Sequence, residues 1–390
     1  MKEYKRARLR AKPGGRKLAS PASTKYHRSP FLISYWRDGR FVFENYLTRR
    51  QIAASPLTST ILDFFGRERT LRELCAFLPE FTASSLEKAV RGLTRHSLLQ
   101  RRGDAAPDGE RELAAWSEWN PAAGFFHLST KDLRFERDAA KEFRALVRLA
   151  KAKPIPQPIK RYPKARQLAL PAPAVHGEFP RVLLERRTWR QFSKRPVTLD
   201  LLGNLLGATW GVRRWVNVPN VGRVAAKTSP SGGALHPIEA YVLARNVEGL
   251  NAGIYHYRGA DHRLELLRRG ASSREITDYL ANQYWYGGAA FVVFMTAVFA
   301  RTRWKYDYAR AYRAVLIETG HLCQTFCLTA TWLGAAPFCT MAFADSKIEK
   351  ALGIDGIAES VLYVAGAGVR PENEKRAHLL SGSEISRLNL

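Results

Sequence analysis

Residues 304–324 read W-K-Y-D-Y-A-R-A-Y-R-A-V-L-I-E-T-G-H-L-C-Q and open the most helix-like part of the chain. From residue 307 to about residue 334 there is no proline, and apolar residues recur at steps of three and four, which predicts a long buried helix. Its entrance is basic and rich in tyrosine, with Arg301, Arg303, Lys305, Arg310, Arg313, Tyr306, Tyr308 and Tyr312. Burying such an entrance is costly unless an anion meets the charges, so we interpret it as one wall of a site.

The segments on both sides of this helix predict an α+β sheet. The apolar run 289–300, directly before it, is too short to span a bilayer and predicts a buried strand. A helix start is predicted at Thr198, which is followed by Asp200 in the first turn. Further helix patterns lie at 181–187, 199–209 and 346–352, and further strand patterns at 238–244, 253–257, 263–267 and 360–365.

The N-terminal third has a different pattern. Two aromatic runs, 31–36 and 41–47, flank Asp38-Gly39, a strong signal for a tight hairpin turn. Three short helix patterns follow, at 57–65, 71–78 and 86–99, with N-caps expected at Thr70 and at Thr82 or Ser84. Two strands and three helices in about seventy residues are typical of a winged-helix module. Such modules bind DNA in some proteins and peptides in others, so the fold alone does not decide between these two ligands.

Composition shifts divide the chain into five parts. We expect a basic disordered tail at 1–29, the winged-helix-like module at 30–102, a connecting region at 103–178, a second domain at 179–376 and a C-terminal tail at 377–390. In the connecting region, 131–152 predicts a basic amphipathic helix. The stretch 153–173 contains six prolines and predicts an extended linker, which is the strongest boundary signal in the sequence.

The net charge is +27, and residues 1–30 hold ten Lys/Arg and one Glu, so +9 lies in the tail and +18 remains elsewhere. This charge favours acidic partners and says nothing about fold. The basic N-terminus lacks the apolar stretch of an export signal, and the four cysteines form no disulfide framework, so we expect a cytoplasmic protein without membrane segments. Cys323 and Cys327 are one helical turn apart, but without a second Cys/His pair at ligand spacing we predict packing and no metal site.

Two further motifs could contact an anionic or planar ligand. R-R-T-W-R places Arg186, Arg187, Thr188 and Arg190 within five residues, and guanidinium groups bind phosphate through paired hydrogen bonds. The alternative is a solvated basic helix end. T-S-P-S-G-G-A matches no dinucleotide or P-loop fingerprint, but its small residues would let backbone N–H groups approach a ring or an anion.

Taken in order, these motifs resemble a known family. R-R-T-W-R-x-F, S-P-S-G-G-A-L-H-P-I-E-A-Y, the Lys305-Tyr306 pair, Y-R before E-x-G-H-x-x-Q, and the small-residue segment near Pro337 are similar to the FMN-dependent nitroreductase superfamily, specifically its SagB/McbC-type branch of azoline dehydrogenases. The resemblance covers about half of the chain, and more weakly the N-terminal part. It implies a nitroreductase-like FMN domain, and an N-terminal region that binds a ribosomally made peptide.

The resemblance also implies residue roles. Arg186, Arg187, Thr188 and Arg190 would hold FMN, while the 230–233 loop would reach a flavin bound mainly by the other subunit of an obligate homodimer. Lys305 and Tyr306 are the catalytic candidates. The full set of implied cofactor residues is Arg186, Arg187, Thr188, Arg190, Pro230, Ser231, Gly232, Gly233, Gln324, Cys339, Thr340 and Arg370. Cyclodehydratase subunits are the implied partners.

Two positions depart from the family pattern. His236 stands where tyrosine is commoner, and Cys339-Thr340 replaces a Gly-Gly pair, which puts the backbone contact to the phosphate in question. Oxidising an azoline requires loss of a proton beside the carbonyl and of a hydride to the flavin. A lysine can act as the base if burial and nearby cations lower its pKa, with Tyr306 orienting Lys305 or relaying its proton.

Three readings of function remain open. The first is an FMN-dependent azoline dehydrogenase acting on a peptide. The second is a general nitroreductase-like oxidoreductase for small molecules, and the third is a winged-helix nucleic-acid binder with a degenerate flavin domain, which the basic charge would suit. The Lys305-Tyr306 pair and the additional N-terminal module favour the first, and nucleic acid is the least expected partner.

Overall fold

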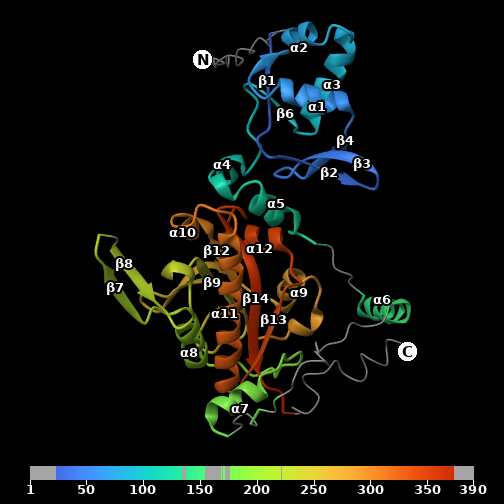
Figure 1. Cartoon of the computed structure of the whole chain (residues 1–390). Helices are drawn as coiled ribbons and strands as arrows, with labels where there is room; N and C mark the ends of the chain where they lie inside the picture. The colour runs from blue at the N-terminus through green and yellow to red at the C-terminus, as the bar shows by residue number, and fades with distance from the viewer. Residues whose placement is uncertain are drawn as a thin grey trace, which may run out of the picture. The chain divides into compact units, whose positions relative to one another are not determined.

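The computed structural model describes residues 23–133, 138–153, 168, 170–171, 176–220 and 222–372. The chain divides into two compact units, with the division between Glu110 and Arg111 (Figure 1). The proline-rich stretch and the C-terminal tail predicted from the sequence lie mostly outside the described residues. Within the described residues, no helix combines the length and apolar character needed to cross a bilayer.

The described residues of the first unit, from residue 23 on, form two small antiparallel sheets and three helices. One sheet has the order β5–β1–β6 and the other β2–β3–β4. Its elements are β1 (Lys25–Arg28), β2 (Leu32–Arg37), β3 (Arg40–Asn45), β4 (Arg50–Ala53), α1 (Pro56–Phe64), β5 (Arg69–Thr70), α2 (Leu71–Phe77), α3 (Ala83–Arg95) and β6 (Leu99–Arg101). Apolar side chains of the three helices, among them Phe65, Leu74 and Leu86, form its buried core.

The predicted hairpin and helix caps of this unit are confirmed. Asp38 and Gly39 both have positive φ, 49° and 72°, as a tight primed turn requires. Thr70 caps α2 and forms a capping box with Glu73, and Thr82, rather than Ser84, caps α3. The disordered tail predicted for 1–29 was wrong at its end, because Lys25–Arg28 is a strand paired with β5 and β6. The winged-helix assignment stays a prediction.

The second unit is built on a six-stranded sheet with the order β11–β10–β9–β12–β14–β13. The resemblance implies a nitroreductase-like domain with a mixed sheet flanked by helices and a long central helix. Every described pair within this sheet is instead antiparallel. A separate hairpin, β7–β8, projects from it. The strands are β7 (Arg214–Val218), β8 (Gly222–Ala226), β9 (Ile238–Ala244), β10 (Gly253–Arg258), β11 (Arg263–Arg269), β12 (Phe291–Val298), β13 (Ala335–Thr340) and β14 (Glu359–Val369).

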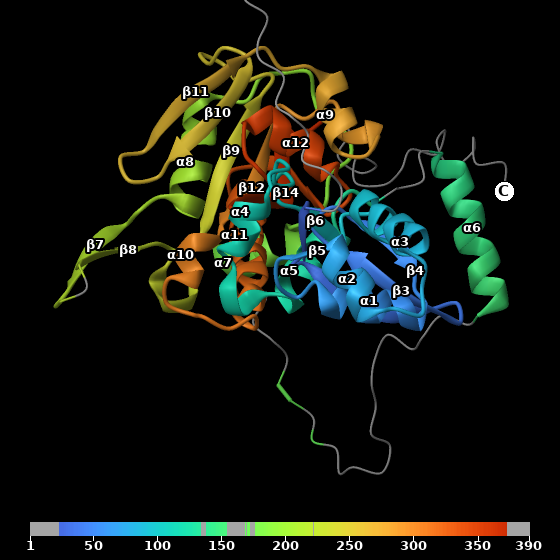
Figure 2. The same cartoon turned by 90° about the horizontal axis from the view of Figure 1, so that it is seen from above.

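Helices cover both faces of this sheet, with α8 and α11 on one face and α9 and α12 on the other (Figure 2). Side chains alternate between the two faces of the sheet along β12, so the strand contributes to a core on each face. Val292 and Phe294 pack on the α9/α12 side, while Phe291 contacts Phe326 of α11. The helices are α4 (Glu110–Ala114), α5 (Ala122–Ser129), α6 (Ala139–Ala152), α7 (Glu178–Glu185), α8 (Leu199–Trp210), α9 (Ser273–Tyr279), α10 (Phe299–Arg303), α11 (Ala311–Trp332) and α12 (Asp345–Leu352).

The long helix predicted at 307–334 is α11, which is shorter by four residues at its start and two at its end. It packs on α8 and on strands β13 and β14. The prediction that it is buried was wrong for one face, where Leu316, Ile317 and Trp332 are 37%, 58% and 52% exposed. The buried strand predicted from the apolar run 289–300 is confirmed as β12, whose residues are buried except for the half-buried Val298.

Candidate functional site

Segment 186–190 follows α7 and brings several predicted cofactor residues to the sheet. The Trp189 N–H donates to Pro337 O of β13 at 2.9 Å, and the Trp189 indole is buried. Two guanidinium groups lie near this indole, that of Arg187 at 5.9 Å and that of Arg370 at 5.4 Å from the ring centroid. Arg370, at the end of β14, therefore lies beside Trp189, which is 181 positions earlier in the chain (370 minus 189). The same indole is close to Arg187 and to Arg370.

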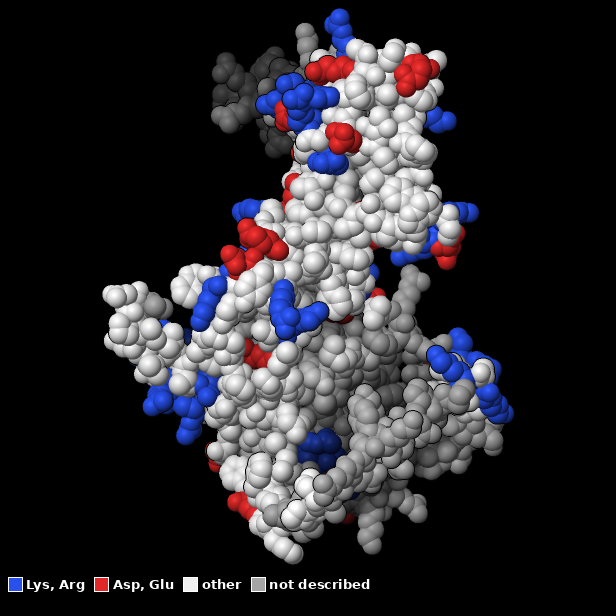
Figure 3. All heavy atoms as spheres, viewed as in Figure 1, with Lys and Arg blue, Asp and Glu red and all other residues white. Residues whose placement is uncertain are grey.

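We call Arg186, Arg187 and Arg370 the arginine cluster. Arg187 Nε donates to Glu185 O at 3.3 Å, while Arg370 donates to Ala335 O and Thr331 O, both at 3.1 Å. These acceptors are backbone carbonyls, and across the described ranges no carboxylate lies within 4.0 Å of the three guanidinium groups. Figure 3 shows recessed Lys/Arg atoms in this part of the second unit, where α7 and the ends of β13 and β14 lie. The cluster is therefore suited to an external anion.

The glycine loop, residues 230–233, lies against the first half of α11. Ser231 Oγ donates to Glu318 Oε2 at 2.6 Å and accepts from the His236 N–H at 2.9 Å. A Cβ built on Gly232 would lie 3.6 Å from Ala314 Cβ, an ordinary contact. The next residue, Gly233, has φ +68°, a conformation that favours glycine.

The Lys305-Tyr306 pair lies between α10 and α11, directly beside this loop. A Cβ added to Gly233 would lie 2.8 Å from Tyr306 Oη and 3.1 Å from Lys305 Nζ. The backbone of the pair is fixed by hydrogen bonds from both N–H groups to Thr302 O, at 3.3 and 3.1 Å, and by the Trp119 indole, which donates to Tyr306 O at 3.0 Å. The fold thus places an amine and a phenol against a glycine that leaves them room.

Comparison with known proteins places this geometry in a family. The model of the family described as “Nitroreductase family” matches residues 183–369. The protein named “Putative nitroreductase MJ1384” of Methanocaldococcus jannaschii is 32% identical over 173 residues, which are 44% of this chain and 83% of that protein. The chain belongs to the nitroreductase family.

Two further relatives of this nitroreductase-family chain are named as processing proteins, one for trifolitoxin and one for microcin B17. “Trifolitoxin-processing protein TfxB” of Rhizobium leguminosarum is 31% identical over 172 residues, 43% of this chain and 46% of that protein. “Microcin B17-processing protein McbC” of Escherichia coli is 31% identical over 132 residues, 32% of this chain and 48% of that protein. The chain therefore spans about half the length of these two relatives. Both matches support the SagB/McbC-type branch predicted from the motifs.

Nitroreductase-family proteins bind flavin, and the predicted flavin residues form two groups in this member. The arginine cluster contacts the last turn of α11 through Thr331, whereas the glycine loop contacts Ala314, Glu318 and His321 in its first half. Thirteen residues separate Glu318 from Thr331, which in a helix corresponds to roughly 20 Å. Gln324 lies between the two groups on the exposed face of α11.

A cavity of about 590 Å³ adjoins the glycine loop of this nitroreductase-family chain, in the range typical of small-molecule sites. Its charged lining is largely paired. Arg301 forms an ion pair with Glu239, and His256 bonds to Glu239 at 3.1 Å and to Glu265 at 2.8 Å. These bonds offset the effect of burial and lower the pKa of Glu239 to about 2. Two indoles, of Trp215 and Trp304, also line the cavity.

Three groups in and beneath this cavity have pKa values shifted chiefly by burial. Burial raises the pKa of Glu318 to about 7, against the hydrogen bond from Ser231. Burial and the charge of Lys227 lower the pKa of His236 to about 4, and burial lowers the pKa of Lys227 itself. Such shifts are found at functional sites. The sequence analysis assigned no role to Lys227, Glu239 or Glu318, and their charge alone does not distinguish them from surface residues.

The side chains of Cys339 and Thr340 are both engaged within the second unit. Thr340 Oγ1 exchanges hydrogen bonds with the Gln283 side-chain amide at 3.1 and 3.2 Å. Thr340 also lines a largely apolar cavity of about 580 Å³ that includes His127, Tyr312 and Leu316. At these two positions, therefore, the backbone is what remains to contact a phosphate or a ring.

His236, the other departure from the family pattern, has a structural environment. Its ring bonds to Ala225 O through Nε2 at 2.9 Å, and its Nδ1 lies 3.8 Å from Glu318 Oε1. The residue also has positive φ, 44°, which places its backbone in the left-handed region. Its ring nevertheless lines the cavity beside Lys227, so a contact with a ligand is compatible with this position.

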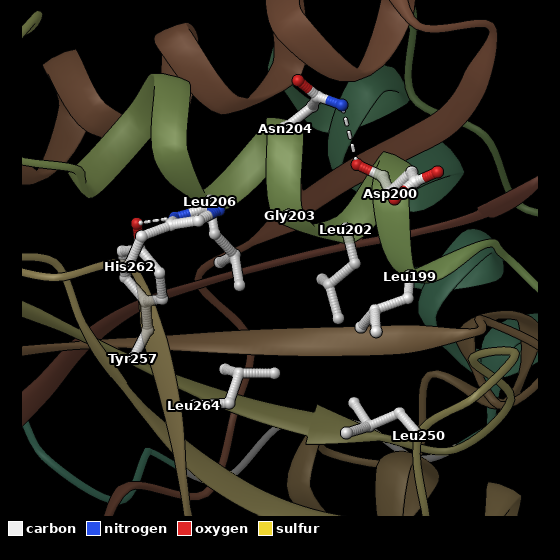
Figure 4. A pocket seen from close by; sticks show the side chains of 10 residues that line it. All are labelled: Leu199, Asp200, Leu202, Gly203, Asn204, Leu206, Leu250, Tyr257, His262 and Leu264. Atoms are coloured by element: carbon white, nitrogen blue, oxygen red, sulfur yellow. Dashed lines mark hydrogen bonds between the residues drawn. The ribbon is translucent and has the colours of Figure 1, made fainter.

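A further cavity of about 460 Å³ lies between α8 and strands β10 and β11 (Figure 4). Leucine side chains line half of it, and two of its polar groups are paired with each other, Tyr257 Oη with His262 Nδ1 at 2.7 Å. The residues that line it are Leu199, Asp200, Leu202, Gly203, Asn204, Leu206, Leu250, Tyr257, His262 and Leu264. The predicted site residues are not in this set, so we do not assign the cavity to flavin chemistry.

Proposed function

We propose that this chain is an FMN-dependent dehydrogenase that oxidises thiazoline or oxazoline rings in a ribosomally made peptide. The observation that carries the proposal is the contact of Gly233 with Lys305 and Tyr306, since it places the candidate base beside the loop assigned to flavin. The processing names of TfxB and McbC support a peptide as substrate.

The residues present fit FMN. The arginine cluster carries positive charge without a carboxylate partner among the described residues, which suits a phosphate, and Thr188 and Arg190 follow in the same segment. We assign Gln324 and the backbone at Cys339 and Thr340 to the same cofactor. The glycine loop, Pro230, Ser231, Gly232 and Gly233, is assigned to its ring, where the missing Cβ of Gly233 leaves space.

We propose a homodimer in which the loop of one protomer faces the arginine cluster of its partner. The separation of roughly 20 Å along α11 supports this arrangement, because one chain holds the two groups far apart. The exposed apolar face of α11 also supports it, together with Leu183 and Leu184 of α7, which are 44% and 68% exposed.

The chain's own residues supply the acid–base part of the reaction. When bound, FMN supplies the acceptor for two electrons and one hydrogen. Lys305 Nζ takes the proton from the ring carbon next to the carbonyl, and Tyr306 Oη orients the amine across the space beside Gly233. The Trp119 hydrogen bond to Tyr306 O holds the pair in place. Each of these roles requires that the group lies within hydrogen-bond distance of the proton that moves, and that its pKa is close to the working pH.

We further propose that the first unit binds the precursor peptide, and that cyclodehydratase subunits are partners of the protein. Basic charge supports an acidic leader sequence or acidic subunits, and Lys and Arg groups lie over hairpin β7–β8 and over α6 in Figure 3. A cytoplasmic location remains part of the proposal.

The match to “Putative nitroreductase MJ1384” favours a second candidate, a general nitroreductase for small molecules. The two functions separate by substrate. An azoline dehydrogenase removes two hydrogens from a ring in a peptide, whereas a general nitroreductase reduces a nitroarene with a nicotinamide as electron donor.

The test uses the full-length protein reconstituted with FMN and a synthetic peptide that contains one thiazoline. Mass spectrometry should detect the loss of two hydrogens from the peptide, and the purified protein should be yellow. A colourless protein that takes up no FMN would contradict the cofactor assignment. Nitroarene reduction without peptide oxidation would support the second candidate instead.

A further inference from the structure

Three of the four cysteines of the chain converge in the second unit. Cys323 and Cys327 lie one turn apart on α11, and Cys339 lies on β13, which packs against α11. Their Sγ atoms all lie within 4.8 Å of one another. The fourth cysteine, Cys75, is in the first unit. The sequence analysis considered only the pair on the helix and so predicted packing, because residue 339 joins the pair only through the fold.

Strand geometry explains how the third thiol reaches the other two. Side chains alternate along β13, and Phe338 faces the α9/α12 core, so Cys339 faces α11. On α11, residues four apart share one side of the helix, which directs Cys323 and Cys327 to the same strand. Both helix cysteines are buried and Cys339 is half-buried.

Packing alone accounts less well for this arrangement than ligation does. A buried cysteine acts as a small apolar side chain, and alanine or valine serves that purpose equally. Three sulfur atoms at one point are instead the donor set of a thiophilic ion, since thiolates prefer Zn²⁺ or Cu⁺ to Mg²⁺ or Ca²⁺. Tetrahedral Zn²⁺ with Zn–S bonds of about 2.3 Å requires sulfur atoms roughly 3.8 Å apart, which small side-chain rotations would provide here.

The surroundings of the three thiols are also suited to an ion. Tyr363 Oη donates a hydrogen bond to Cys339 Sγ at 3.4 Å, a contact that would orient this ligand.

We propose that Cys323, Cys327 and Cys339 bind a Zn²⁺ ion that ties α11 to β13, with water or the Tyr363 hydroxyl in the fourth position. The ion would hold β13 four residues along the strand from Ala335 (339 minus 335), whose carbonyl accepts from Arg370. This inference is independent of the proposed reaction, because metal binding can be measured with or without FMN.

The experiment measures zinc in the full-length protein purified under reducing conditions, and then titrates the metal-free protein with Co²⁺. About one zinc per chain and a thiolate-to-Co²⁺ charge-transfer absorption are expected. Cys339→Ser and Cys323→Ser should abolish the absorption, and Cys75→Ser is the matched control that should retain it. Tyr363→Phe should weaken Zn²⁺ binding by about 10- to 100-fold, as is typical for a group that orients a ligand.

Two outcomes would overturn the inference. One is a wild-type protein that contains no zinc and gives no thiolate absorption with Co²⁺, which decides the question even if a cysteine variant fails to fold. The other is a disulfide among the three cysteines in the protein as purified under reducing conditions, detected by its mass before and after strong reduction.

Discussion

Positively charged side chains near the two ends of α11 have different partners. Near Thr331, the arginine cluster donates to backbone carbonyls and leaves its charge without a carboxylate among the described residues. Near Ala314, the charged groups of the cavity are largely paired with each other, as Arg301 is with Glu239. The arginine cluster near Thr331 is thus suited to bind an external anion, whereas the cavity near Ala314 contains its own acid–base groups.

This difference assigns phosphate binding to the arginine end of α11 and proton transfer to the glycine-loop end. Unpaired guanidinium groups are suited to hold a phosphate tightly, because charge-assisted hydrogen bonds are stronger than neutral ones. Buried titratable groups with shifted pKa values, such as Glu318 and Lys227, are suited to control protonation near a reacting molecule. Variants at the two ends should therefore change different quantities.

The largest effect is expected at the glycine-loop end. Lys305→Ala should slow peptide oxidation by about 100- to 10,000-fold, because removing a general base costs this much, while FMN affinity is unchanged. Turnover with the thiazoline peptide is the measurement, and Lys347→Ala, exposed on α12, is the control. If Lys305→Ala and Tyr306→Phe both retain full activity with bound FMN, the catalytic assignment is wrong.

A pH-dependent effect is expected at Glu318. Its pKa of about 7 in the folded chain is above the ordinary value of 4.5, so the folded state binds the proton more tightly. The stabilising contribution is therefore present below about pH 4.5 and is lost as pH rises towards 7, by up to about 3 kcal/mol. Glu318→Gln should remove this part of the pH dependence.

Denaturant unfolding of wild type and Glu318→Gln from pH 4.5 to 8 measures the difference between their free energies of unfolding. Taking the difference cancels the opposite dependence that His236 contributes. Glu248→Gln, exposed in the loop after β9, should follow wild type throughout. A constant difference across this range would contradict a raised pKa for Glu318.

At the arginine end, Arg187→Ala should weaken FMN binding about 10- to 100-fold, since a hydrogen bond to a charged group contributes about 1.5–3 kcal/mol. Turnover at saturating FMN should stay close to wild type. Fluorescence titration with FMN gives the affinity, and Arg274→Ala, exposed on α9, is the control. If Arg187→Ala reduced turnover but left FMN affinity unchanged, the assignment of cofactor binding to the arginine end and of the reaction to the glycine-loop end would be wrong.

The smallest effect compares two neighbouring glycines. Gly233→Ala should destabilise the fold by about 1–2 kcal/mol because a side chain is strained at φ +68°. It should also slow oxidation, since the new Cβ would displace Tyr306 and Lys305. Gly232→Ala, whose Cβ would meet only an ordinary contact, should change both stability and activity little. Equal unfolding midpoints for the two variants would argue against this placement of the loop.

Local pattern predicted much of the fold. The apolar period of α11, the mostly apolar run of β12 and the Asp38-Gly39 turn each depend on residues close in sequence. Pattern failed where pairing is distant, as for β1, a short polar strand that exists because β5 and β6 flank it. Strand β13 was also missed as an element, since its A-A-P-F-C-T sequence has no alternation of polar and apolar residues.

The candidate site shows the same division. The arginine run, the glycine loop and the Lys305-Tyr306 pair were found because each is contiguous. Cys339 was noted as a departure from a family pattern and as a cofactor candidate, but not as a partner of the helix cysteines, and Glu318 was noted only as a letter in a motif. Both contacts depend on neighbours at least twelve residues away in sequence.

The sequence by itself determined the family, the α+β character and the identity of the side chains able to bind an anion or move a proton. Only the tertiary structure decided which of them meet, namely Arg187 with Arg370 across Trp189, Gly233 with Lys305, and three thiols between α11 and β13. The physical reason is that helix and strand periods act over a few residues, whereas burial of a whole sheet face brings distant segments together.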